Sequence, residues 1–262
     1  MSEILKIGIY QFDVIWEDIV ANQQKIERLL KNTTNIPDIL VLPEMYTTGF
    51  SMKPFNIDKN LLLKQTNWQE DISVKYKCAI IGSILFPKGK SYVNRCLYTS
   101  SIKNTDYYDK RHLFLTEKDC GYYSAGSDRK IFEHENYRIM PQICYDLRFP
   151  VWSRNNQNYQ VLIYVSNWPS TRQNVWNTLL AARAIENQCY VVGVNRVGAD
   201  LNNINYIGES AVYSPSGEEI SKQGKEESYI EVKLSLQELI NFRNKFPFYL
   251  DMDDFEIKNP GN

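Results

Sequence analysis

The chain has 262 residues, of which 43% are hydrophobic and 23% are charged, and its formal net charge at pH 7 is -1. This size allows one large domain or two small ones, and the composition is typical of a globular protein with a substantial core. No run of basic residues is longer than two, so the chain lacks the positive patch that nucleic acid or an anionic membrane would require. We expect a small-molecule partner instead.

The N-terminal segment MSEILKIGIYQF has neither the charged nor the apolar region of a secretion signal, and the longest apolar runs, ILVL and VLIYV, are strand-sized. The five cysteines are scattered without CxxC spacing, which indicates neither a disulfide framework nor a zinc site. Only two histidines are present, His112 and His134. The sequence therefore predicts a cytoplasmic protein with reduced thiols and with no metal or cofactor.

The first half of the chain is expected to alternate strands and helices. Apolar runs predict strands at 6–12, 39–42, 78–86, 92–100 and 106–110, and helical spacing predicts helices at 17–31 and 59–76. Pro87-Lys88-Gly89-Lys90 reads as a hairpin turn between two of the strands.

The second half has the same order of elements. Its expected strands are 137–143, 160–166, 189–197, 209–214 and 228–233, and its expected helices begin at Pro150 and cover 170–187. Ser170 and Gln173 have the spacing of a capping box. Pro141 cannot donate to a strand ladder, which predicts a bulge or an irregular strand there.

This repeated order predicts an α/β fold, a four-layer α-β-β-α sandwich in which two mixed sheets stack and the helices lie outside. Residues 1–245 would form a single domain. The aromatic and acidic segment 246–262 is either a tail that packs on this domain or on a second subunit, or a frayed end.

Cys144 is expected at a strand-to-helix turn, because the strand 137–143 precedes it and Pro150 suits a helix start. Backbone N–H groups at the start of a helix have no partner within it, so a ligand can bind there. This position suits a nucleophile. A buried structural thiol is the alternative interpretation, since free cysteine is among the most buried residue types.

Glu44 and Lys110 also follow strands, at the ends of ILVLP and TDYYD. Strand ends are where distant segments of an α/β protein converge on a ligand. A Cys144 thiolate could attack an amide carbonyl, Glu44 could carry protons, and Lys110 with the N–H of Tyr145 could stabilise the oxyanion. Taken singly, a Glu after a strand is more often a solvated or capping carboxylate, and a Lys in YDKRH is more often surface charge.

The motifs LPEMYTTGF, YYDKRHLF and ICYDLRFPVWSRN closely resemble those of the nitrilase-related amidohydrolases, the carbon–nitrogen hydrolase superfamily. The resemblance extends through SNWPSTR and LLAARAIENQCYVVGVNRVG to nearly the whole chain. It implies that Glu44, Lys110 and Cys144 are the catalytic residues, and that the fold is an α-β-β-α sandwich, commonly in a homodimer. TTGF, DLRFPVWSRN and NWP resemble the ω-amidase branch, which hydrolyses the terminal amide of 2-oxoglutaramate and related 2-oxo acid monoamides.

The chain departs from the family pattern in one place. The family's second Glu, in the loop after the Lys motif, is replaced by Asp119, and Glu117 would reach the site only if that loop shifted. Asp119 as a plain surface acid is an equal alternative.

Residues that bind the substrate are harder to predict. Arg172 is a candidate for binding a substrate carboxylate, and Tyr46 and Trp168 are candidates for the pocket walls. Arg148 and Arg183 are expected to pair with acids such as Asp146 and Glu186. We expect His112 to pack and His134 to lie in a solvated turn.

Three hypotheses follow. The preferred one is a cofactor-independent ω-amidase that uses Cys144, 2-oxoglutaramate or 2-oxosuccinamate being the substrate. The second is another amide, carbamoyl or nitrile hydrolase of the same superfamily. The third is an inactive scaffold that retains the fold. A Cys–His protease is disfavoured, because neither histidine has an evident orienting group in the sequence.

Overall fold

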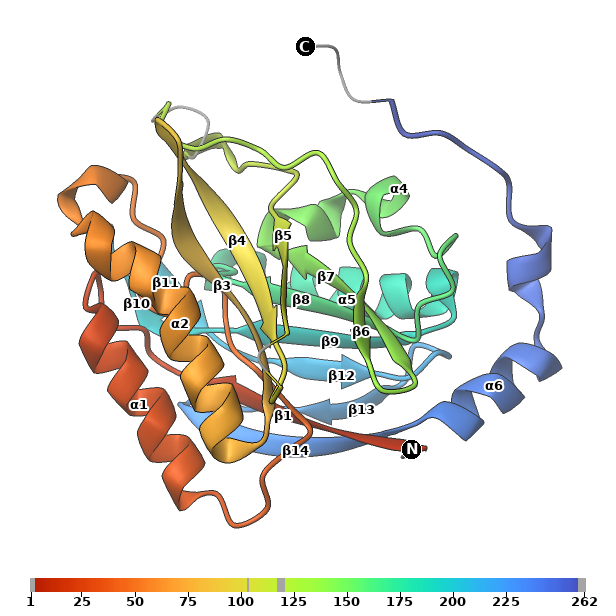
Figure 1. The fold of residues 1–262 in the computed structure, drawn as a ribbon. Coiled ribbons are helices and arrows are strands. Elements are labelled where there is room, and N and C mark those ends of the chain that lie inside the picture. Colours follow the sequence, from red (N-terminus) through yellow and green to blue (C-terminus); the bar gives the residue numbers. More distant parts are fainter. Residues whose placement is uncertain (1–2, 103, 117–120, 259–262) are drawn as a thin grey trace.

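The computed structural model describes residues 3–102, 104–116 and 121–258. Two six-stranded sheets form the centre of the molecule, with strand orders β14-β1-β2-β3-β4-β5 and β13-β12-β9-β8-β7-β6 (Figure 1). A separate two-stranded hairpin, β10 (Val197–Ala199) and β11 (Asn205–Ile207), lies at one end. The predicted pair of mixed sheets is confirmed.

The first sheet combines strands from both ends of the chain. Its members are β1 (Ile4–Gln11), β2 (Ile39–Val41), β3 (Ala79–Lys88), β4 (Ser91–Thr99), β5 (Thr105–Asp109) and β14 (Ser228–Ser235). The strands β1, β2 and β3 are parallel, and the antiparallel strand β14 closes the edge beside β1. Helices α1 (Ile19–Asn32) and α2 (Lys59–Tyr76) pack on its outer face, and the short helix η1 (Pro54–Asn56) precedes α2.

The second sheet comes entirely from the second half of the chain. Its members are β6 (Phe132–His134), β7 (Tyr137–Ile143), β8 (Val161–Ser166), β9 (Tyr190–Asn195), β12 (Ala211–Tyr213) and β13 (Glu219–Lys222). The helices between these strands are η2 (Cys144–Arg148), α4 (Pro150–Ser153), η3 (Ser170–Arg172) and α5 (Gln173–Asn187). The chain continues beyond β14 as α6 (Leu236–Lys245) and η4 (Phe248–Asp251).

The main core lies between the two sheets. Alternate residues of each strand point into it, as the period of two in a β-strand requires. Ile7 and Ile9 of the first sheet and Ile163 and Val192 of the second belong to one cluster of fully buried side chains. Two further clusters lie under α1 and α2 and under α5, so each sheet is buried on both faces. The predicted α-β-β-α layering is therefore confirmed.

Three local predictions are wrong. The strand β7 keeps a regular register with β8 through the pair Pro141 and Ile163, so no bulge forms. Ser170 does not cap α5, because residues 170–172 form the separate helix η3 and α5 begins at Gln173 without a side-chain cap. The expected strand 189–197 is also divided, since β9 ends at Asn195 and β10 begins at Val197.

Candidate active site

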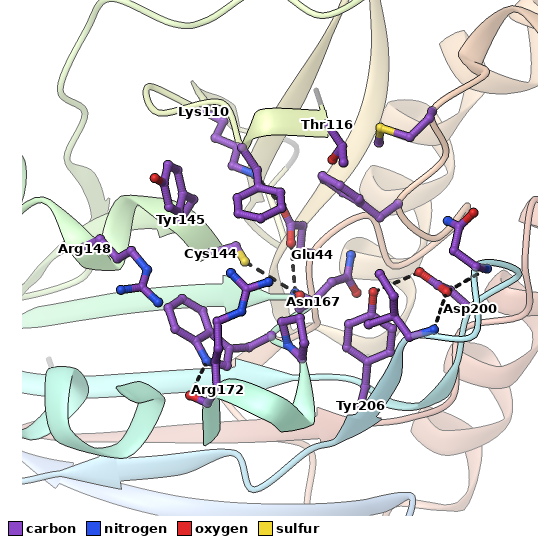
Figure 2. Close-up of a pocket in the computed structure, with 17 residues that line it drawn as sticks. Glu44, Lys110, Thr116, Cys144, Tyr145, Arg148, Asn167, Arg172, Asp200 and Tyr206 are labelled. Atoms are coloured by element: carbon purple, nitrogen blue, oxygen red, sulfur yellow. Dashed lines mark hydrogen bonds and ion pairs between the residues drawn. The ribbon is translucent and has the colours of Figure 1, made fainter. Parts of the chain in front are cut away.

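The chain brings Glu44, Lys110 and Cys144 together at the ends of three strands (Figure 2). Glu44 lies just beyond β2, Lys110 directly follows β5, and Cys144 directly follows β7. Lys110 Nζ lies 2.9 Å from Glu44 Oε1, and each of these side chains is 1% exposed. The predicted convergence of the three residues is therefore present in the fold.

The Glu44 carboxylate accepts three hydrogen bonds from three separate segments. Oε1 accepts from Asn94 Nδ2 of β4 at 2.7 Å and from Lys110 Nζ, and Oε2 accepts from the backbone N–H of Asn167 at 2.8 Å. A buried charge requires this degree of compensation. These contacts fix the position of the Glu44 side chain against Lys110.

Lys110 is fixed from its main chain as well as its side chain. Its N–H donates to Asn94 O at 2.9 Å, and its carbonyl accepts from Gly126 N at 2.8 Å. A Cβ on Gly126 would lie 2.1 Å from Asp109 O, so only glycine permits this close approach. The ammonium lies 5.2 Å from the centre of the Phe50 ring, within cation–π range.

Cys144 occupies a strained turn. Its φ of 45° lies in the left-handed region, which is uncommon for residues other than glycine and often marks a functional site. The turn is stabilised by Asp146, whose Oδ2 accepts from Ile143 N at 3.0 Å. Cys144 as a residue is partly exposed and lines the cavity, and its Sγ lies 3.8 Å from Asn167 O. The alternative of a fully buried structural thiol is therefore excluded.

Burial raises the pKa of the Cys144 thiol well above its ordinary value, and the charge of Glu44 raises it further. Lys110 acts in the opposite direction, because its positive charge favours the thiolate. Burial and the Glu44 charge outweigh the effect of Lys110, so the raised pKa keeps the Cys144 thiol neutral in the resting site. A proton acceptor is needed at the moment of attack, and Glu44 is the adjacent candidate.

A second carboxylate, Asp146, lies on the other side of the turn and is fully buried. Its Oδ1 accepts from the backbone N–H of His112 at 2.9 Å and lies 2.8 Å from His112 Nδ1. Its Oδ2 accepts from the Tyr108 hydroxyl at 2.8 Å as well as from Ile143 N. Asp146 thus joins the segment around Lys110 to the segment around Cys144.

Seventeen of the described residues line the cavity at Cys144, which encloses about 100 Å³. Besides the three residues above, its walls include aromatic side chains and two arginines, Arg148 and Arg172. Arg148 lies over the Trp168 ring at 5.4 Å and Arg172 over the Phe114 ring at 5.2 Å. The far wall is formed by the β10–β11 hairpin and contains Asp200, Asn202, Ile204 and Tyr206.

The structure places the predicted substrate-binding residues differently. Trp168, Arg172 and Tyr145 line the cavity, whereas Tyr46 does not. The prediction for Tyr46 is wrong, because its ring packs against Gly82 and its hydroxyl donates to Gln69 Oε1 at 2.7 Å under α2. Asp119 and Glu117 lie outside the described residues.

The predictions for the other charged residues are partly correct. Arg183 pairs with Glu186 at 3.1 Å as predicted. The predicted pairing of Arg148 with Asp146 is wrong, because Arg148 lines the cavity and Asp146 bonds His112. His112 packs against the Phe149 ring at 3.7 Å, as expected. His134 ends β6 and its Nδ1 lies 3.0 Å from the Tyr98 hydroxyl, so the expected solvated turn is wrong.

Sequence reasoning missed several residues of the site. Asn94 had a detectable signal, because it is a polar residue within the apolar run of β4. Asn167, Arg148, Asp200 and Tyr206 gave no comparable signal, since only the tertiary fold brings them to the cavity. Within residues 3–102, 104–116 and 121–258, no group of three or more His, Cys, Asp or Glu could hold a metal ion.

Comparisons with known proteins show the family to which the chain belongs. The carbon–nitrogen hydrolase family matches residues 6–244. The ω-amidase YafV of Yersinia enterocolitica is 42% identical over 254 residues, covering 96% of this chain and 98% of that protein. The 2-oxoglutaramate amidase of Bacillus subtilis (strain 168) is 31% identical over 252 residues, covering 94% of this chain and 96% of that protein.

A solved structure from Xanthomonas campestris, described as a CN-hydrolase superfamily protein with an arsenic adduct in the active site, has a TM-score of 0.90 and 34% identity. It covers 98% of this chain and 100% of that chain. The family match, the relatives and this fold agree over almost the whole sequence. The chain therefore belongs to the carbon–nitrogen hydrolase family within the nitrilase superfamily, and it resembles the ω-amidase branch.

Proposed function

We propose that this protein is an ω-amidase, which hydrolyses the terminal amide of a 2-oxo acid monoamide, 2-oxoglutaramate or 2-oxosuccinamate, to the dicarboxylate and ammonia. The observation that carries the proposal is the contact of Glu44 with both Lys110 Nζ and Asn167 N beside the Cys144 thiol. The named ω-amidase relatives support the choice of substrate class. No cofactor takes part in this reaction.

In the first step, Sγ of Cys144 attacks the amide carbon and its proton passes to Glu44. The carbonyl oxygen becomes an oxyanion that Lys110 and the backbone N–H of Tyr145 stabilise. Tyr145 occupies the first turn of η2, where N–H groups have no partner within the helix. Loss of one such donor typically costs about 3 to 4 kcal/mol in the transition state.

In the second step, the C–N bond breaks and Glu44 returns the proton to the departing ammonia. A water molecule then attacks the Cys144 thioester, giving one proton to Glu44. The C–S bond breaks, the carboxylic acid is released and the proton returns to the thiol. One acid–base group thus serves both halves of the reaction, which matches the position of Glu44 between the thiol and Lys110.

The carboxylate end of the substrate requires cations. Arg148 and Arg172 both line the cavity that contains the thiol, and guanidinium groups are well suited to carboxylates. The two arginines therefore favour a substrate with a free carboxylate over a neutral aliphatic amide or a nitrile. Trp168 supports the Arg148 guanidinium through its ring face.

The direct test is ammonia release from 2-oxoglutaramate by the wild-type protein and by Cys144→Ala. We expect activity in the first and none in the second. A panel of glutamine, N-carbamoyl amino acids, aliphatic amides and nitriles should give much lower kcat/KM values. A preference for any of these compounds would show that the protein catalyses another reaction of the superfamily. Activity toward neither 2-oxoglutaramate nor any compound of the panel would favour an inactive scaffold.

The expected homodimer and cytoplasmic location are further parts of this proposal. The segment after α6 exposes Phe248 and Leu250, at 62% and 70%, which supports an apolar contact with a second copy. Sedimentation velocity should show a dimer, and the double variant Phe248→Ser with Leu250→Ser should weaken it.

The cysteines support the proposed location. The described cysteines, Cys78, Cys96, Cys144 and Cys189, are all free, as a reducing compartment would leave them. No helix in the described part of the chain combines the length and apolarity needed to cross a bilayer.

A further inference from the structure

Asn167 combines a main chain that contacts the candidate catalytic residues with a side chain that has no hydrogen-bond partner among the described residues. Its backbone N–H donates to Glu44 Oε2 at 2.8 Å, and its carbonyl oxygen lies 3.8 Å from Cys144 Sγ. The residue directly follows β8, so its main chain is held at the centre of the site. Its side chain therefore starts within a few atoms of the reacting groups.

The side-chain amide of Asn167 is buried, at 7% exposure of the residue, and it lines the cavity. Neither Oδ1 nor Nδ2 has a hydrogen-bond partner among the described residues. In Figure 2, Asn167 lies between Glu44 and Tyr206. Buried polar groups are nearly always bonded, so an unpaired amide facing a cavity calls for an explanation.

Asn195 provides an internal comparison. It ends the neighbouring strand β9, where it is also buried, but both of its side-chain atoms are bonded. Oδ1 accepts from Trp168 N at 2.8 Å and Arg196 N at 3.0 Å, and Nδ2 donates to Trp168 O at 3.1 Å and Gly208 O at 3.0 Å. The described residues thus provide hydrogen-bond partners for the side chain of Asn195, at the end of β9, but none for the side chain of Asn167.

A ligand group that matches Asn167 offers an acceptor to Nδ2 or a donor to Oδ1. In the proposed mechanism, Arg148 and Arg172, which line the cavity, bind the substrate carboxylate, and Lys110 with Tyr145 N binds the scissile carbonyl. The 2-oxo oxygen is the polar atom that these groups leave without a donor. A buried carbonyl without a donor is costly, so a donor at this place would favour 2-oxo acids.

We propose that Asn167 is the specificity-determining residue for the 2-oxo group, and that its Nδ2 donates to that oxygen in the bound substrate. This inference rests on the proposed ω-amidase function and adds to it. In this assignment, Glu44, Lys110 and Cys144 cleave the amide, and the two arginines bind the carboxylate. Asn167 distinguishes a 2-oxo acid amide from the analogue that lacks the 2-oxo group.

The experiment compares 2-oxoglutaramate with glutaramate, which has the same length, carboxylate and terminal amide but no 2-oxo group. In the wild-type protein, kcat/KM should be higher for 2-oxoglutaramate. In Asn167→Ala, the ratio of the two kcat/KM values should fall about tenfold, which corresponds to about 1.4 kcal/mol. The value for glutaramate should change little.

Two further variants separate recognition from structure. Asn167→Leu keeps a similar volume without a hydrogen-bonding atom and should lose the same preference as Asn167→Ala. Asn174→Ala changes an exposed asparagine on α5 and should keep the wild-type ratio. A cooperative thermal unfolding transition in each variant would serve as the control that the variant is folded.

The outcomes are distinct. An equal fall for both substrates, or an unchanged ratio in both Asn167 variants, overturns the role of Asn167 while the ω-amidase function stands. Wild-type protein that hydrolyses neither compound overturns the proposed function itself.

Discussion

Two buried carboxylates flank the Cys144 turn, and they differ in what surrounds them. Glu44 accepts three hydrogen bonds and lines the cavity, whereas Asp146 accepts from Tyr108, from Ile143 N and from His112 and is absent from the cavity wall. A carboxylate that faces a ligand and a thiol can move protons. One whose partners are all fixed groups of the fold can only maintain geometry. In the mechanism that we propose, the chain uses one carboxylate for proton transfer on one side of Cys144 and the other for positioning on the opposite side.

Glu44→Gln should produce the largest effect on activity. The amide keeps the volume of Glu44 but cannot take the thiol proton, and a positioned acid–base group typically contributes about 10²- to 10⁴-fold. We expect kcat for 2-oxoglutaramate to fall within that range or further. Glu219→Gln, on the exposed strand β13, should leave kcat unchanged. Full activity in Glu44→Gln would remove Glu44 from the mechanism.

Asp146→Asn should act mainly on stability. The substitution removes the negative partner of His112 and places an NH₂ where Tyr108 or Ile143 now donates. Each buried donor left without its acceptor typically costs about 1 to 3 kcal/mol, so two such donors cost about 2 to 6 kcal/mol. Urea unfolding should show a loss of this size, and a variant as stable as the wild-type protein would contradict the positioning role of Asp146.

Tyr108→Phe should give a smaller loss on the same side of the site. The hydroxyl donates to Asp146 and accepts from Trp152 Nε1 at 2.9 Å and from Arg111 N at 3.1 Å, so its removal leaves buried groups unpaired. We expect unfolding free energy to fall by about 1 to 3 kcal/mol. The neighbouring Tyr107 is 43% exposed, and Tyr107→Phe should change the unfolding free energy far less.

The smallest expected effect concerns the thiol itself. Burial and the Glu44 charge raise the pKa of Cys144, so its alkylation by iodoacetamide should be slow at neutral pH and accelerate as pH rises past the ordinary thiol range. In Glu44→Gln one of these causes is absent while Lys110 remains, so the pKa should fall and alkylation at neutral pH should become faster. Cys144→Ala gives the background labelling. Slower alkylation in Glu44→Gln would contradict this assignment of charges.

Much of the framework follows from the sequence because it depends on local patterns. The helix Lys59–Tyr76 and the strand Tyr137–Ile143 were predicted with the bounds that they have in the structure. The meeting of Glu44, Lys110 and Cys144 was predictable because each follows a buried strand within a family motif.

The sequence could not show contacts between distant segments. Asp146 and His112 are 34 residues apart and meet only after the sheets stack. Tyr46 is predicted to wall the pocket but packs under α2, because the sequence does not show to which face a residue after a strand points. The unpaired state of Asn167, in contrast to Asn195, depends on neighbours from several loops.

The central claim is that Cys144 forms a covalent acyl intermediate with the help of Glu44. Rapid mixing with 2-oxoglutaramate, acid quenching and mass spectrometry of the peptides should find the acyl group on Cys144 and no adduct in Cys144→Ala. Ammonia release at the full rate without any adduct at Cys144, or an adduct on another residue, would contradict the account.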